Sequence, residues 1–351
     1  MRLIHNRVLL SHKSENFLFA VSLFVSVIIT FVNTFYSEAT YDSGDGVQHY
    51  LIARYAIKHP ELFLDLWGKP LFTLLSFPFA QYGLRGMVVF QLMCSVITTI
   101  FLFLSIRGLG LRHGWLSPFF IFFAPVYFAV INSGLTEILF CTFFVIALWL
   151  LVKKRYWIAS LFFSFAPFVR PEANFLIPLF ITILVIKRKF IQVTLLSSGY
   201  ILFSIIGYFF YYHDIFWVFK HNYKFEQFYQ QKGSLFHYAI NYKVIWGGWF
   251  AILLIAGILK LIIFSLKEYH KSRKLSYGTI LLLIMISGSL LVIFALHTFM
   301  NWLPGIPNNL GMLRYMVTII PQSAVLAIYA LNLFERVRTG WLLKWPFFLL
   351  T

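Results

Sequence analysis

The chain has 351 residues, of which 60% are hydrophobic and only 12% are charged, and its mean hydropathy is +0.80. This composition excludes a soluble globular domain and predicts an integral membrane protein. The formal net charge of +17 would suggest nucleic-acid binding in a soluble protein. Here the basic residues stand in short clusters between apolar runs, so the positive-inside rule explains them and no nucleic-acid partner is expected.

Successive apolar runs, each closed by charged residues, Gly or Pro, predict an all-α, polytopic transmembrane helical bundle of about 10–12 spans. A β-barrel would show alternating polarity instead. An eleventh run begins at Trp341 and is half a span long, so the last span is expected to be incomplete and the chain to be a fragment. The expected helices cover residues 17–36, 85–106, 115–131, 135–152, 156–169, 174–186, 191–212, 244–266, 277–298 and 315–334.

We expect one transmembrane domain with a cytoplasmic N-terminus. Its first run reads as a signal anchor, because it is too long for a signal peptide and no cleavage site follows. The basic clusters then all fall inside, provided that residues 69–83 are interfacial or re-entrant. The expected parts are the first span (17–36), a first outer loop with interfacial helices (37–84), central spans (85–212), a long outer loop (213–243) and C-terminal spans (244–351).

The stretch "YDSGDGVQHY" (41–50) places Asp42, Asp45 and His49 directly after the first span. We expect an amphipathic helix to begin after Asp45, with Asp45 as its N-cap and Asp42 in the preceding turn. A carboxylate beside an imidazole could take a proton from an acceptor hydroxyl, and the three side chains could instead hold Mg²⁺ or Mn²⁺. Capping and an Asx-turn alone explain the same residues without a function.

Two further motifs place charges near the predicted outer face. Glu137, in "NSGLTEILF" (132–140), stands in the first turn of a helix, where the helix dipole also favours an acid. Arg170 and Glu172, in "FVRPEANF", are flanked by apolar sequence on both sides, which is costly unless they face a polar cavity or each other. Arg170 suits a phosphate ligand, and a structural Arg–Glu pair is the alternative.

The late outer segments add a third set of candidates. Arg314, in "NNLGMLRYMVTIIP" (308–321), could reach lipid headgroups or bind a lipid phosphate. The loop 213–243 is dense in aromatic residues, which stack on sugar rings or form an interfacial belt. In the expected orientation nine of the twelve acids lie outside, so we predict a polar cavity at the outer face.

Together these stretches resemble the GT-C superfamily of polyprenyl-phosphate-sugar-dependent membrane glycosyltransferases. The similarity is to the branch of protein O-mannosyltransferases, aminoarabinose transferases and bacterial mannosyltransferase-related enzymes. It rests on the acidic first loop, "KPLFTLL" (69–75), "SGLTE" ending at Glu137, and "LRYMVTIIP". The resemblance implies a multi-pass protein of the bacterial cytoplasmic (inner) membrane, with its active site on the outer face.

The resemblance also implies a reaction and roles for single residues. A hexosyl or pentosyl group would pass with inversion from a polyprenyl-phosphate donor to a glycan, lipid or protein acceptor. Asp42 or Asp45 would be the general base, with Asp45 preferred for its place beside the helix and His49. Glu137 would bind hydroxyls, and no cofactor is expected beyond the metal ion considered above. Substrate-binding residues would be His49, Lys69, Glu137, Arg170, Glu172 and Arg314, with Lys69 and the two arginines at the departing phosphate.

Three other functions compete with this interpretation. A flippase or other transporter of lipid-linked glycans would carry ionisable groups near the bilayer midplane or in both halves of an inverted repeat. A cell-envelope glycan ligase or polymerase would centre its chemistry on a long late outer loop, such as 213–243. A non-catalytic assembly protein would not need the aspartates and arginines at all.

Overall fold

The computed structural model describes residues 12–36, 40–42, 44–220, 233–303 and 310–342, with side chains of α18 described as far as Asn332. Within these residues every regular element is helical and no strand occurs, which confirms the all-α prediction. The apolar run expected from Trp341 onward lies almost entirely outside the described residues.

Every one of the ten expected segments is helical. Six helices are long and apolar enough to cross a membrane, or seven if the pair 114–122 and 125–131, bent by 68°, is one span. The multi-pass architecture is therefore confirmed, although the described helices supply fewer full-length spans than the ten expected. The helices are α1 (His12–Tyr36), α4 (Gly83–Gly108), α5 (Ser117–Phe122), α6 (Pro125–Ile131), α7 (Glu137–Val152), α8 (Tyr156–Phe163), α9 (Ala173–Ile186), α10 (Phe190–Thr194), α11 (Ser198–Gly207), α15 (Gly248–Ser272), α16 (Tyr277–Leu281), α17 (Ser289–Trp302) and α18 (Ile320–Leu342).

The described part of the segment 37–84 forms short helices. Its stretch 69–83 forms α3, whose 11 residues extend roughly 16 Å, about half of the ~30 Å hydrocarbon thickness. This length agrees with an interfacial or re-entrant helix and not with a separate crossing.

Further short elements occur along the chain. With those of the first loop they are α2 (Asp45–Tyr55), η1 (Pro60–Leu64), α3 (Pro70–Ala80), η2 (Gly114–Leu116), η3 (Ala166–Phe168), α12 (Trp217–Lys220), α13 (His237–Ile240), α14 (Tyr242–Ile245) and η7 (Leu313–Ile319).

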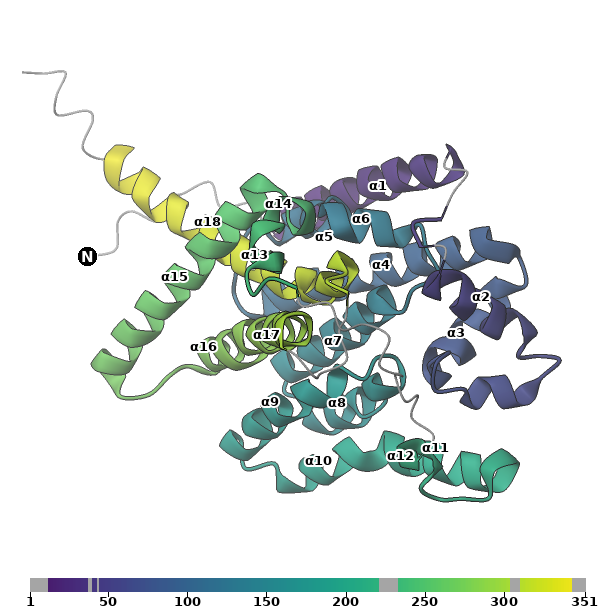
Figure 1. Cartoon of the computed structure of the whole chain (residues 1–351). Coiled ribbons are helices and arrows are strands. Elements are labelled where there is room, and N and C mark those ends of the chain that lie inside the picture. Colours follow the sequence, from purple (N-terminus) through teal and green to yellow (C-terminus); the bar gives the residue numbers. More distant parts are fainter. Residues whose placement is uncertain (1–11, 37–39, 43, 221–232, 304–309, 343–351) are drawn as a thin grey trace, which may run out of the picture.

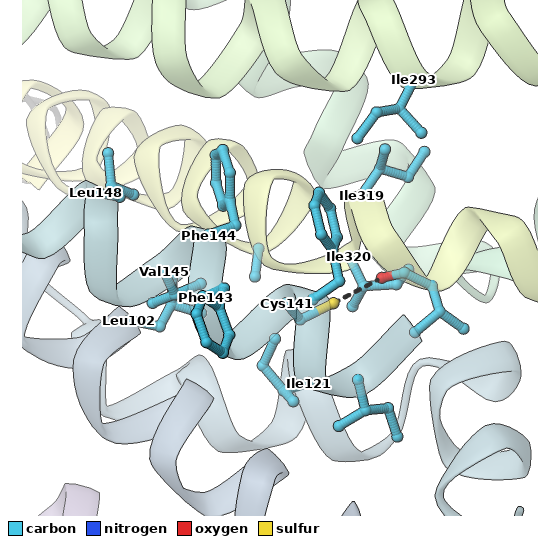
Figure 2. Close-up of a cluster of buried hydrophobic side chains, with 14 of the residues drawn as sticks. Leu102, Ile121, Cys141, Phe143, Phe144, Val145, Leu148, Ile293, Ile319 and Ile320 are labelled. Carbon is cyan, nitrogen blue, oxygen red and sulfur yellow. Dashed lines mark hydrogen bonds between the residues drawn. The ribbon is translucent and has the colours of Figure 1, made fainter. Parts of the chain in front are cut away.

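The central element of the bundle is α7. It is apolar on all sides after Glu137, and 13 of its 16 residues are buried, as expected for a helix surrounded by others. It packs against α4 on one side and against η7 and α8 on others. Figure 2 shows this core, where the Cys141 thiol donates to the carbonyl of Val317 at 3.4 Å among Phe144, Ile319 and Ile320.

The connections between helices gather at two ends of the bundle. In Figure 1, α2 and α3 lie at the right of the view, and the α9–α10 and α15–α16 connections lie at the left. The helix α7 runs between these ends with Glu137 in its first turn, and its 16 residues extend about 24 Å. We call the end at Glu137 the network end, because a network of charged side chains meets there, and the end at Lys153–Arg155 and Lys187–Lys189 the basic end.

Candidate functional site

The first loop is fastened to the α6–α7 loop by backbone contacts. The Tyr41 N–H donates to the carbonyl of Asn132 at 2.9 Å. Beside it, Gly46 and Gly134 approach so closely that a Cβ on Gly134 would lie 2.2 Å from the carbonyl oxygen of Gly46. Only glycine fits this approach. It holds the acids of the first loop against the start of α7, where Glu137 lies.

The turn before α2 corrects one expectation. The helix begins at Asp45 itself, its N-cap residue is Gly44, and no side chain caps it, so the prediction that Asp45 is the N-cap was wrong. Instead Asp42 Oδ1 accepts the backbone N–H groups of Gly44 at 3.0 Å and Gly46 at 2.8 Å. The first of these bonds is the expected Asx-turn.

Arg314, in η7, joins the two aspartates of the first loop. Its Nη1 lies 2.6 Å from Asp42 Oδ2, and its Nη2 contacts Asp45 Oδ2. Its Nε lies 3.9 Å from Glu137 Oε1. The Arg314 side chain is only 5% exposed, so its charge is balanced by these carboxylates and not by water.

Arg170 forms the second half of the cluster. It follows η3, outside any helix, and its Nη1 lies 2.7 Å from Glu137 Oε1. Its Nη2 lies 2.5 Å from Glu172 Oε1, and its Nη1 also donates to Thr136 Oγ1 at 3.0 Å. Glu137 therefore contacts both arginines, and one continuous set of ion pairs results. We call it the ion network: Asp42, Asp45, Glu137, Arg170, Glu172 and Arg314.

Two residues that the sequence analysis did not name support this network. The guanidinium carbons of Arg170 and Arg314 lie 5.5 and 5.4 Å from the ring centroid of Tyr315, within cation–π distance. The His297 ring stacks on Tyr315 with centroids 4.6 Å apart, and its Nε2 lies 3.5 Å from Glu172 Oε1. A histidine within an apolar span was a sequence signal for His297.

His49 and Lys69 lie beside the network without an ion pair to it. His49 is buried in α2, its ring centroid lies 5.6 Å from that of Phe72, and its Nδ1 has no hydrogen-bond partner among the described residues. Burial lowers the pKa of His49 to about 3, and the charge of Lys69 acts in the same direction. The imidazole is thus neutral at physiological pH.

Lys69 is the cation of this region that no carboxylate holds. Its Nζ donates to the Leu66 carbonyl at 3.0 Å, and no ion pair to it is found in the described part of the chain. Burial lowers the pKa of Lys69, while the nearby charge of Glu172 raises it. The residue precedes Pro70 at the start of α3 with a left-handed φ of 60°. The charges of Glu172, Arg170 and Asp45 act on Lys69, so its ammonium group lies near the network without an ion pair to it.

The exposed fraction of the acidic side chains increases along the ion network from Glu137 to Asp45. The Glu137 side chain is 1% exposed, that of Asp42 is 16% and that of Asp45 is 34%. Asp42 is fully engaged, because its oxygens accept two backbone N–H groups and contact Arg314. Asp45 Oδ1 has no hydrogen bond within the described residues. The arrangement can therefore accept a proton at Asp45, on a carboxylate that Arg314 keeps in place.

The structure does not assemble the considered metal ligands. Among the described residues no three His, Cys, Asp or Glu side chains are grouped to hold a metal ion. Arg314 contacts both Asp42 and Asp45, whereas His49 is turned to Phe72. In this arrangement the Arg314 guanidinium takes the place between the two carboxylates that a Mg²⁺ or Mn²⁺ ion would need, so the three residues do not form a metal site here.

The described part of the long loop 213–243 makes contacts of its own. Lys220 pairs with Asp214 at 2.6 Å, on the exposed surface. The ring nitrogen Nε2 of His237 hydrogen-bonds the Gly311 carbonyl at 2.8 Å, which ties α13 to the segment before η7. Residues 221–232, with four of the loop's ten Phe, Trp and Tyr residues and two of its four lysines, lie outside the described residues.

Comparison with protein-family models, with curated proteins and with solved structures finds no match to this chain. The functional interpretation therefore rests on the residues and their geometry. What the geometry identifies is a multi-pass helical membrane protein with a buried ion network that opens at Asp45 and has an unpaired lysine beside it.

Proposed function

We propose that this protein is a membrane glycosyltransferase of GT-C type. It transfers a sugar, with inversion, from a polyprenyl-phosphate donor to an acceptor hydroxyl at the outer face of the bacterial cytoplasmic membrane. The observation that carries the proposal is the ion network: four carboxylates and two arginines from separate parts of the chain meet at one end of an apolar bundle. Burying these charges is costly, and such clusters mark functional sites.

The reaction assigns a distinct task to Asp45. The acceptor oxygen attacks the anomeric carbon from the side opposite the phosphate, and the C–O bond to phosphate breaks with its electron pair leaving on the phosphate. The acceptor proton passes to Asp45 Oδ1, the free oxygen of a carboxylate whose Oδ2 contacts Arg314. General-base assistance of this kind contributes about 10²–10⁴-fold to a rate. Asp42, in contrast, holds the turn and Arg314.

The departing phosphate is assigned to Lys69. The resemblance implied Arg170, Arg314 and Lys69 as phosphate ligands, but carboxylates contact both arginines closely. Lys69 has no such partner among the described residues, and half-burial makes its charge act over a short, poorly screened distance. Glu137 Oε2, buried without a hydrogen-bond partner, is the acceptor that we assign to a sugar hydroxyl.

Reconstituted protein tests the proposal directly. Proteoliposomes are supplied with radiolabelled polyprenyl-phosphate sugars, and transfer is measured for wild type, Asp45→Asn and Glu61→Gln, with added Mg²⁺ or with EDTA. Glu61 is a matched control because it is an acid of the same loop, paired only with His59 at the surface. We expect transfer that survives EDTA, is lost in Asp45→Asn and is retained in Glu61→Gln. Movement of the labelled lipid across the bilayer without sugar transfer would instead identify a transporter.

A further inference from the structure

A second charged feature lies at the basic end, about 24 Å along α7 from the ion network. An open cavity of about 380 Å³ is lined there by Lys154, Arg155 and Lys189, with Trp157 and Gln192 in its wall. No carboxylate pairs with any of these three cations within the described residues. The proposed glycosyl transfer does not use this cavity.

The same backbone turn builds both sides of the cavity. After α7, the N–H of Lys154 bonds the Leu151 carbonyl at 2.8 Å and that of Arg155 bonds the Leu150 carbonyl at 2.8 Å. After α9, Arg188 and Lys189 repeat this pattern with bonds of 2.9 and 2.8 Å. Both turns are Schellman motifs, which favour glycine at the left-handed position.

Neither turn has that glycine. The left-handed residue is Lys154, with a φ of 57°, after α7, and Arg188, with a φ of 54°, after α9. Each therefore accepts backbone strain that glycine would avoid. The helix dipole favours a cation near a helix C-terminus but does not require one at this position. Cations thus occupy the left-handed positions of both turns at a cost to the backbone, and of the two residues Lys154 lines the cavity while Arg188 precedes Lys189, which also lines it.

The cavity also faces the first turn of α8. The first intrahelical bond of α8 runs from the Ala159 N–H to the Arg155 carbonyl at 2.9 Å, so the N–H groups of Tyr156, Trp157 and Ile158 precede it. Arg155, the N-cap residue, gives no side-chain cap. Free N–H groups and the positive end of the dipole favour an anion, above all a phosphate group.

The rim of the cavity is apolar. Trp157 and Ile158, which line the cavity, are 54% and 50% exposed, and Phe190 and Ile191, which stand between the lining residues Lys189 and Gln192 in the sequence, are 62% and 65% exposed. With the Gln192 side-chain oxygen toward the indole, Trp157 Nε1 donates to it at 2.8 Å, which fixes the indole in the wall. An indole at the boundary between charged and apolar surface is typical of the lipid headgroup level. The occupant must therefore combine an anionic group with hydrocarbon.

We propose that this cavity binds the phosphate headgroup of an anionic phospholipid. The cations Lys154, Arg155 and Lys189 and the α8 N–H groups receive the phosphate, and the acyl chains lie along Trp157, Ile158, Phe190 and Ile191. The positive-inside rule explains how many cations this end carries, but it does not explain why three exposed cations are grouped around one open cavity beside apolar side chains.

Native mass spectrometry of the full chain tests the site, with titration of phosphatidylglycerol, phosphatidylcholine or inorganic phosphate. The variant is Lys154→Met/Lys189→Met, and the matched control Lys267→Met/Lys271→Met removes the same charge from exposed positions on α15. We expect wild type to bind phosphatidylglycerol selectively, the cavity variant to lose roughly 10- to 30-fold in affinity, and the control to lose less than about 2-fold.

Two results would overturn the proposal. Equal losses in both variants would show that diffuse charge binds the lipid and not this cavity. Inorganic phosphate that competes as well as the lipid would show that the cavity takes a free anion. Unfolding temperatures of both variants, measured without lipid, identify any loss of affinity that comes from a misfolded chain.

Discussion

The two ends of the bundle use positive charge in opposite ways. At the network end, Arg170 and Arg314 are buried and each contacts two or more carboxylates. At the basic end, Lys154, Lys187 and Lys189 lie over aromatic rings, and no acid pairs with any side chain of Lys153–Arg155 or Lys187–Lys189 in the described part of the chain. Paired burial fixes a geometry, whereas unpaired exposure leaves a charge free to bind an external anion.

Substitution of one arginine at each end should give the largest difference in stability between the two ends. Arg170→Met leaves Glu137 and Glu172 buried with fewer partners, so we expect a loss of about 3–5 kcal/mol in the free energy of unfolding. Arg188→Met, at an exposed position of the basic end, should change it by less than about 0.5 kcal/mol. Denaturant unfolding in detergent measures both, and similar values for the two variants would contradict the contrast.

A pair of glycine substitutions compares packing at the two ends. In Gly134→Ala the new Cβ would lie 2.2 Å from the Gly46 carbonyl oxygen, so the first loop must move. We expect destabilisation of about 1–3 kcal/mol together with reduced sugar transfer. In Gly278→Ala, in α16 near the basic end, the Cβ meets nothing within 4 Å. That variant should unfold and react as wild type does, and an effect equal to that of Gly134→Ala would refute the close approach.

The stability of the protein should depend on pH because His49, beside the ion network, has a lowered pKa in the folded state. Its pKa is about 3 in the folded protein, against about 6.5 in the unfolded chain. The unfolded chain therefore binds a proton that the folded protein excludes, and stability present above pH 6.5 is lost as the pH falls toward 3. At pH 5 the resulting loss in the free energy of unfolding is about 2 kcal/mol. In His49→Gln the unfolding free energy should fall less between pH 7 and pH 5, and an unchanged slope would show that His49 titrates normally.

Much of the fold was predictable because apolar runs in a membrane protein leave few alternatives. Each expected segment became helical, and the stretch 69–83 stayed too short to cross. The number of spans was harder to predict, because α7, α8 and α9 are apolar throughout but short. Hydropathy measures preference for hydrocarbon and does not say whether protein or lipid provides the apolar surroundings.

The members of the ion network were predictable, and the Arg170–Glu172 pair was one of the alternatives considered, but the contacts of Arg314 and Glu137 were not predicted. Ionisable residues in an apolar chain need partners, which is why all six residues of the ion network could be named from the sequence. Which arginine meets which acid depends on tertiary packing, since Arg314 reaches Asp42 across most of the chain. The N-cap was misplaced by one residue, because Gly44 takes that position and Asp42 accepts the free N–H groups.

In the proposed reaction Asp45 takes the proton while its neighbour Asp42 holds the loop, and matched variants of the two aspartates separate these roles. Sugar transfer from a radiolabelled polyprenyl-phosphate donor is measured for Asp45→Asn and Asp42→Asn, with folding checked by the unfolding temperature. We expect Asp45→Asn to lose about 10²–10⁴-fold in rate while it remains folded, and Asp42→Asn to retain transfer to within about 10-fold, because its Oδ1 still accepts the Gly44 and Gly46 N–H groups. Full transfer by Asp45→Asn would contradict the account.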